Sequence, residues 1–134
     1  MPANTTPIFT LTPIIGMAEI STANTALDGS GTLGTVVTGG TNGTRITRIT
    51  IQATATTTAG VIRLFIADNA GTPNIRLWRE VLVPAITPST TVLAFISTIS
   101  LTGEAAVHLP ASYTLRASTH NAEAFNIFAE GGNF

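Results

Sequence analysis

The chain has 134 residues, a formal net charge of −1 and only 10% charged residues, against about 25% in an average domain. Apolar residues make up 44% of the chain. This combination excludes a disordered chain, which needs low hydrophobicity and high net charge, and it excludes a broad basic surface for nucleic acid. With no cysteine, the chain has no disulfides, no thiol catalysis and no cysteine-based zinc site. The length fits one domain with a core of its own.

Residues 1–40 are expected to form an extended N-terminal arm with one or two edge segments. Prolines and the glycine-rich stretch Asp28–Gly34 interrupt this region, although Thr35–Thr38 has the composition of a strand. A short helix within 17–27 is a weaker option, because Thr, Asn and Ser disfavour it. The apolar side chains of the arm must pack either on the chain's own sheets or on a neighbouring subunit, which makes them candidate interface residues: Ile8, Phe9, Leu11, Ile14 and Ile15.

No targeting or membrane segment is predicted. The first ten residues lack the basic and continuously apolar regions of a signal peptide. No apolar run approaches the roughly 18 residues that a membrane-spanning helix needs. We therefore expect no membrane partner.

Residues 41–134 are predicted to form an all-β domain with antiparallel strands. Apolar and polar residues alternate along Ile49–Ala53, which places Ile49 and Ile51 on one face. Both faces of 61–67 are partly apolar, which indicates a strand covered on both sides. Strands and turns recur every 8–12 residues or so, as in an antiparallel sandwich or barrel. The further predicted strands are 74–83, 91–97, 104–109, 112–118 and 124–129.

The motifs that suggest chemistry all have simpler explanations. Gly29–Gly34 matches the G-x-G-x-x-G spacing, but a strand and not a helix follows it, so a flexible loop is the better interpretation. His108 and His120, even with Glu104 and Glu123, do not form a recognisable metal-ligand pattern. A Ser112–His108–Asp68 triad lacks a nucleophile elbow. We therefore predict no enzyme, no metal site and no cofactor.

The basic residues and the single tryptophan are compatible with protein contacts. All six basic residues are arginines, which tolerate partial burial better than lysine and are enriched at interfaces. Trp78 lies between Arg76 and Arg79 and is either a core residue or an interface anchor. We keep it as a candidate interface residue, with the core as the default.

The order of strand and turn residues over roughly 44–134 resembles small tailed-bacteriophage virion proteins of the head decoration (cement) type. The segments that carry the resemblance are 44–54, 59–68, 77–84, 109–118 and 125–134. The resemblance implies a jelly-roll-like β-sandwich and a homo-oligomer, most often a trimer, that sits on a capsid shell. It implies no ligand residues.

The expected function is therefore that of a non-enzymatic virion structural protein, made in the host cytoplasm and placed on the capsid surface. Its partners would be copies of itself and the major capsid protein or another virion protein. Two alternatives keep the fold. One is a receptor- or glycan-binding module of a phage fibre or spike, which needs an exposed aromatic platform such as Tyr113 or Trp78. The other is a subunit of a self-assembling tube or lattice.

Overall fold

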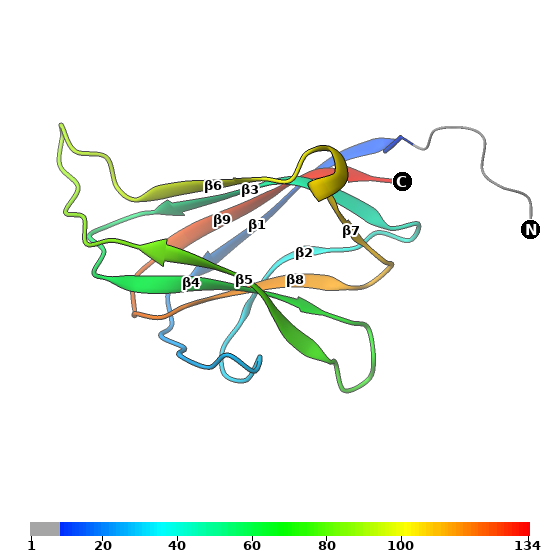
Figure 1. The fold of residues 1–134 in the computed structure, drawn as a ribbon, viewed down its shortest axis with the longest axis horizontal. Helices are drawn as coiled ribbons and strands as arrows, with labels where there is room; N and C mark the ends of the chain where they lie inside the picture. Colours follow the sequence, from blue (N-terminus) through cyan, green and yellow to red (C-terminus); the bar gives the residue numbers. More distant parts are fainter. Residues whose placement is uncertain (1–8) are drawn as a thin grey trace, which may run out of the picture.

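The computed structural model describes residues 9–134 and is all-β, with no α-helix among these residues. Its antiparallel strands form two open sheets (Figure 1). Sheet A has the order β1-β9-β3-β6, with β7 also paired to β3, and sheet B has the order β2-β8-β4-β5. The strands are β1 (Thr12–Ile20), β2 (Gly34–Thr38), β3 (Thr44–Ala53), β4 (Gly60–Ala67), β5 (Ile75–Val83), β6 (Ile96–Ser100), β7 (Val107–Leu109), β8 (Thr114–Thr119) and β9 (Phe125–Asn133), with one 3-10 turn, η1 (Gly103–Ala105).

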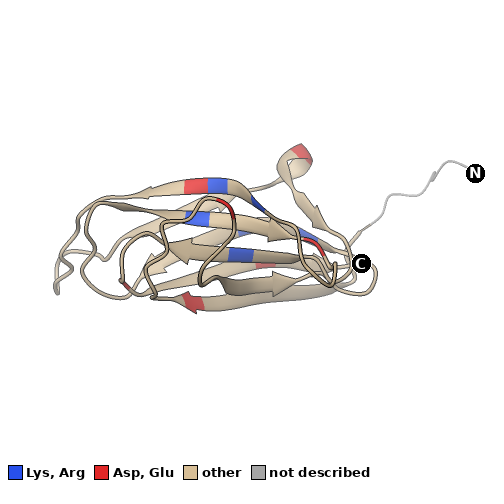
Figure 2. Ribbon diagram, turned by 90° about the horizontal axis from the view of Figure 1, so that it is seen from below, with Lys and Arg blue, Asp and Glu red and all other residues tan. Residues whose placement is uncertain are grey.

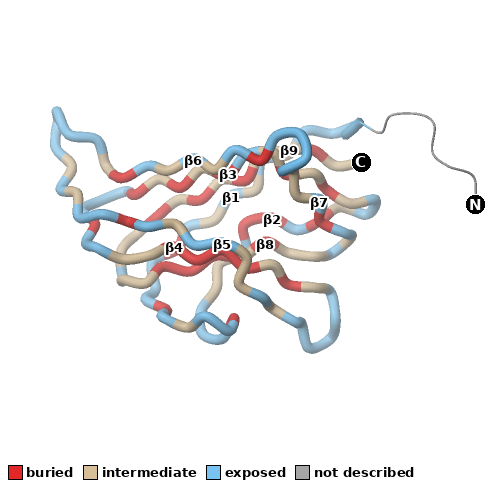
Figure 3. The backbone as a smooth tube through the Cα atoms, in the orientation of Figure 1, coloured by how far each residue is buried: buried red, intermediate tan, exposed pale blue. Residues whose placement is uncertain are grey.

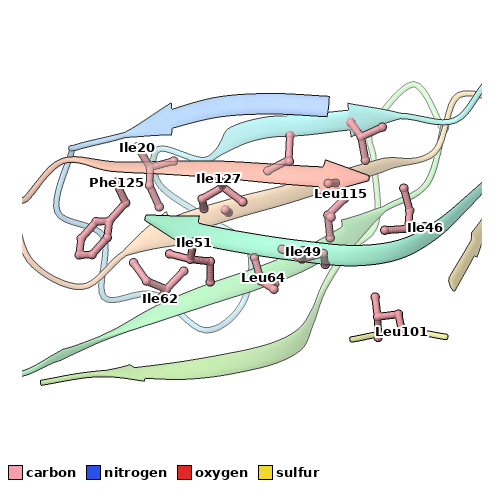
Figure 4. Close-up of a cluster of buried hydrophobic side chains, with 14 of the residues drawn as sticks. Ile20, Ile46, Ile49, Ile51, Ile62, Leu64, Leu101, Leu115, Phe125 and Ile127 are labelled. Carbon is pink, nitrogen blue, oxygen red and sulfur yellow. The ribbon is translucent and has the colours of Figure 1, made fainter. Parts of the chain in front are cut away.

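The core lies between the two sheets, which face one another. Ile49 and Ile51 of β3 are buried, as their alternation predicts, and they meet Ile62 and Leu64 of β4 and Ile127 of β9 (Figure 4). Each such side chain contributes roughly 1.5–3 kcal/mol when it leaves water completely. The period-two pattern of the sequence therefore determines which face of each strand points inward.

A β-bulge in β3 keeps two core residues pointing inward although they are three positions apart. The pairing of β3 with β9 shifts between Ile46 and Arg48, so Thr47 is the extra residue. Without it, Ile46 and Ile49 would lie on opposite faces, because side chains alternate along a strand. Both are instead almost fully buried.

The described part of the predicted arm contributes strands to both sheets. β1 and β2 are edge strands, in agreement with the expected edge segments, and β1 pairs with β9 along its whole length. The option of a helix within 17–27 is wrong, because Met17–Ile20 continue β1 opposite Phe125–Phe128. The part of the arm before residue 9 lies outside the described residues.

The predicted strands of the second half are confirmed except at two places. The strand expected at 91–97 begins only at Ile96, because the Ser89 hydroxyl accepts the backbone N–H groups of Thr91 and Val92 and holds a turn there. The strand expected at 104–109 is reduced to β7 by the preceding turn η1.

The loop between β1 and β2, residues 21–33, covers the outer face of sheet B. The Asn24 carbonyl accepts a hydrogen bond from the buried Arg63 guanidinium of β4, and Gly29 lies against Ile75 of β5. Phe65 of β4 points away from the main core and is nevertheless fully buried. This confirms that β4 is covered on both sides.

We predict that Gly131→Ala destabilises the fold by about 3 kcal/mol, at the upper end of the usual cost of overpacking. A Cβ atom at this position in β9 would overlap the Arg45 carbonyl oxygen in the backbone of β3. Gly71→Ala is the matched control, because no atom lies within 4 Å of its added Cβ. Chemical denaturation measures both changes, and equal effects at the two glycines would contradict the close approach of β3 and β9.

We predict that Asp68→Ala weakens the β4–β5 turn at neutral pH and that this effect fades in acid. The side-chain amide of Asn74, and then the backbone N–H groups of Asn74 and Ala70, bind the Asp68 carboxylate and hold its pKa below the usual 3.8. A lowered folded-state pKa stabilises the protein above the unfolded value, and this stabilisation is lost as the pH falls through the folded value. Denaturation midpoints at pH 7 and pH 2.5 measure the difference, and a gap that widens in acid would contradict the prediction.

Candidate functional site: two exposed apolar surfaces

The outer face of sheet A carries large apolar side chains that nothing among the described residues covers. Leu11, Ile15 and Met17 share one side of β1 and its start, and they are 83%, 62% and 67% exposed. Phe128 of β9 lies directly opposite Met17 on the same face. Phe9, 73% exposed, precedes this row. A monomer seldom exposes more than about 300–600 Å² of contiguous apolar surface, and such patches are often functional.

A hollow lies beside these protruding side chains. Its volume is about 440 Å³, and Gly131 and Gly132 of β9 form part of its lining, together with Pro13, Ile15 and Arg45. Thr10 also lines the hollow, and its side chain lies over Gly132. A second hollow of about 300 Å³, lined by Met17, Glu19, Asn126 and Phe128 among others, lies toward the other end of the same face.

Charges are few on this face. Arg48 and Glu130 form an ion pair with each other across β3 and β9. Glu19 of β1 lies at one end of the face and Arg45 of β3 at the other, and neither has an ion-pair partner within residues 9–134. Figure 2 shows how sparsely charges are distributed over the ribbon.

A second apolar surface, called the tip surface here, lies where β5 ends and β6 begins. It consists of Leu82, Val92, Leu93 and Ile96, of which Leu93 is 83% exposed and Leu82 76% exposed. The connection between the two strands projects from the left of the molecule in the view of Figure 3, at the end away from the described termini. Ile96 points to the outer face of sheet A, where Gln52 and Asn126 lie between it and β1, so polar residues separate the two apolar surfaces.

The structure divides the predicted interface residues into three groups. Phe9, Leu11 and Ile15 are exposed, and Ile8 lies outside the described residues. Ile14 packs against the core, because it alternates with Ile15 on β1. Trp78 also packs against the core, which matches its default interpretation, and the Arg79 guanidinium lies over its ring.

Sequence reasoning missed Met17 and the whole tip surface. Met17 is separated from Leu11 and Ile15 by an even number of positions, so all three side chains point to the same side of a strand. Strand alternation therefore predicts an exposed Met17 once β1 is recognised as a strand. The tip surface had no such signal, because Val92 and Leu93 look like strand residues and lie in an irregular loop.

The residues considered for catalysis or metal binding are not brought together. His108 stacks on Phe134 beside sheet A, whereas the His120 ring contacts Arg63 at sheet B. Within residues 9–134 no three potential metal ligands cluster. Asp68 binds its own turn, and the strand β2 follows Gly29–Gly34, as predicted.

Comparison with known proteins identifies no relative, since no protein-family model and no curated protein sequence matches the chain. Among the residues that the structure describes, no helix has the length and apolar character needed to cross a membrane.

We predict that Ile15→Thr and Met17→Thr change the free energy of unfolding by less than about 0.5 kcal/mol, because both side chains are largely exposed in the monomer. Ile127→Ala is the buried control and should cost about 2–5 kcal/mol. Denaturant unfolding at low protein concentration measures all three. A large loss at Ile15 or Met17 would mean that the fold itself needs this surface.

Proposed function

We propose that this chain is a non-enzymatic structural protein of a tailed-phage particle, which decorates or stabilises the head as a homo-oligomer. The observation that carries the proposal is the presence of two separate apolar surfaces on a chain with very few charges. An oligomer that also binds a shell needs one surface for its own copies and another for the shell. The outer face of sheet A and the tip surface meet this requirement.

The proposal includes a jelly-roll fold, and the strand order supports it. A jelly roll has two four-stranded antiparallel sheets in which the first strand neighbours the last, and viral capsid proteins use this arrangement. Here the order is β1-β9-β3-β6 in sheet A and β2-β8-β4-β5 in sheet B, so the first strand lies beside the last. The resemblance of residues 44–134 to head decoration proteins agrees with this fold.

The mechanism would be the burial of apolar surface at many equivalent positions. A standard protein contact buries about 1,600 Å² in total. Because the copies are linked in an oligomer, binding of one copy raises the effective concentration of the next at its own position. Repeated over a shell, such contacts hold neighbouring capsid subunits together and make the shell harder to open.

Of the two alternatives, the glycan-binding module fits the described surface less well. A glycan-binding module depends on exposed aromatic residues, and Trp78 and Tyr113 both pack against the core. A tube or lattice subunit needs a contact that repeats without closing, which two separate apolar surfaces also permit. Electron microscopy of the purified protein separates this option, because it would show open polymers.

Gold-labelled antibody against the purified protein tests the proposal on phage particles from the source culture. We expect label distributed over the heads. Label confined to tail fibres would replace the proposal with the receptor-binding alternative. Particles without any label, in a preparation where the antibody detects the free protein, would contradict a virion role.

A further inference from the structure

We propose that the outer face of sheet A binds an acidic peptide segment of a partner protein, and that Arg45 of β3 receives the carboxylate of that segment. Arg45 lies between two hollows of this face and has no carboxylate partner among the described residues. The contact goes beyond the proposed function, because such a segment binds the purified protein whatever particle the chain belongs to.

Arg45 belongs to a row of paired residues that crosses four neighbouring strands of sheet A. From β1 through β9 and β3 to β7, the row consists of Pro13, Gly132, Arg45 and His108. Directly paired residues point to the same face of a sheet, and Arg45 points outward because its neighbour Ile46 belongs to the core. The row is about 14 Å long at the usual spacing of strands.

Two hollows flank Arg45 along this row, and Arg45 lines both of them. The first is the hollow of about 440 Å³ that Gly131 and Gly132 help to line. The second has a volume of about 450 Å³, and its other lining residues are Asn42, His108 and Phe134. An extended peptide rises about 3.3 Å per residue, so about four residues span the row. Such a segment places one side chain at Arg45 and its neighbours in the two hollows, whereas a single small anion occupies only one.

The guanidinium of Arg45 needs an acceptor that the described residues do not supply. Its Nε atom is buried without a hydrogen-bond partner, and Arg45 forms no ion pair with another described residue. Glu130, the one carboxylate in the lining of the first hollow, is already paired with Arg48. A buried donor without a partner is costly, and a carboxylate meets a guanidinium through two parallel hydrogen bonds. An acidic side chain therefore complements Arg45.

A carboxylate suits these hollows better than a phosphate group. A phosphate group on a side chain carries close to two negative charges at neutral pH and is usually bound by several basic side chains. Among the described residues, neither lining contains a second arginine. One carboxylate carries a single negative charge, which balances the single guanidinium of Arg45.

The second hollow has a flat apolar wall beside Arg45. The rings of His108 and Phe134 stack there, with their centroids 6.0 Å apart and an angle of 25° between their planes. Aromatic faces bury apolar side chains effectively. The segment that fits best therefore carries an Asp or Glu residue with an apolar residue next to it.

Titration of the isotope-labelled protein with the peptide Ala-Leu-Glu-Leu-Ala, blocked at both ends, tests the site by NMR spectroscopy. We expect saturable shifts of the Arg45 Nε–H signal and of the backbone signals of Gly132 and His108. The same peptide with Gln in place of Glu should bind at least about tenfold more weakly, because it loses the charge-assisted hydrogen bonds. Arg45→Gln should remove the preference for the Glu peptide. Arg76→Gln, which changes an exposed arginine of β5 in sheet B, is the matched control and should keep it.

Three outcomes would overturn the proposal. The first is the absence of a saturable shift at Arg45 with the Glu peptide up to about 10 mM, a concentration at which even weak specific binding is detected. The second is equal binding of the Glu and Gln peptides, which decides the role of the carboxylate even if Arg45→Gln does not fold. The third is binding of sodium acetate or sodium glucuronate as tight as that of the Glu peptide, which would assign the site to a small anion or an acidic sugar.

Gold labelling of phage heads does not depend on any of these results. Failure of the peptide site and failure of the virion role are therefore distinguishable.

Discussion

The loop between β1 and β2 covers one of the two outward faces of this structure and leaves the other open. Asn24 and the buried Arg63 fix this loop beneath sheet B, so β4 is shielded on both sides. Asn24 further stabilises the loop through its side-chain amide, which donates to the carbonyls of Ser30 and Thr32. Sheet A has no equivalent cover among the described residues. The exposed apolar side chains on its outer face are therefore available for a partner.

The outward faces of the sheets carry few charged side chains, and this affects how they approach a partner. Threonine is the commonest residue of the chain, and side chains such as Thr50 and Thr98 occupy outward positions where many proteins place lysine or glutamate. Such surfaces approach one another without like-charge repulsion, because they carry almost no net charge. The same property would make a free monomer prone to association, since exposed apolar surface unprotected by charge favours it.

The alternation of apolar residues predicted most of the fold. Ile49 and Ile51 belong to the core as expected, and the strands β3, β4, β5, β8 and β9 lie close to their predicted positions. Local patterns could not predict β1 in full, because its regularity depends on pairing with β9, more than a hundred residues later. The tip surface was also beyond sequence analysis, since a single hydroxyl, that of Ser89, turns apolar residues into a loop. The candidate interface was predicted in part, because Leu11 and Ile15 stood out by hydrophobicity whereas Met17 required the strand register.

A cryo-electron microscopy map of the assembled particle tests the central claim most directly, because it shows which surfaces of this chain are covered. The account predicts density for this protein on the head, with the outer face of sheet A and the tip surface both covered, one by a second copy and the other by the shell. A map in which the outer face of sheet A faces solvent, while the 21–33 loop forms the contacts, would contradict it.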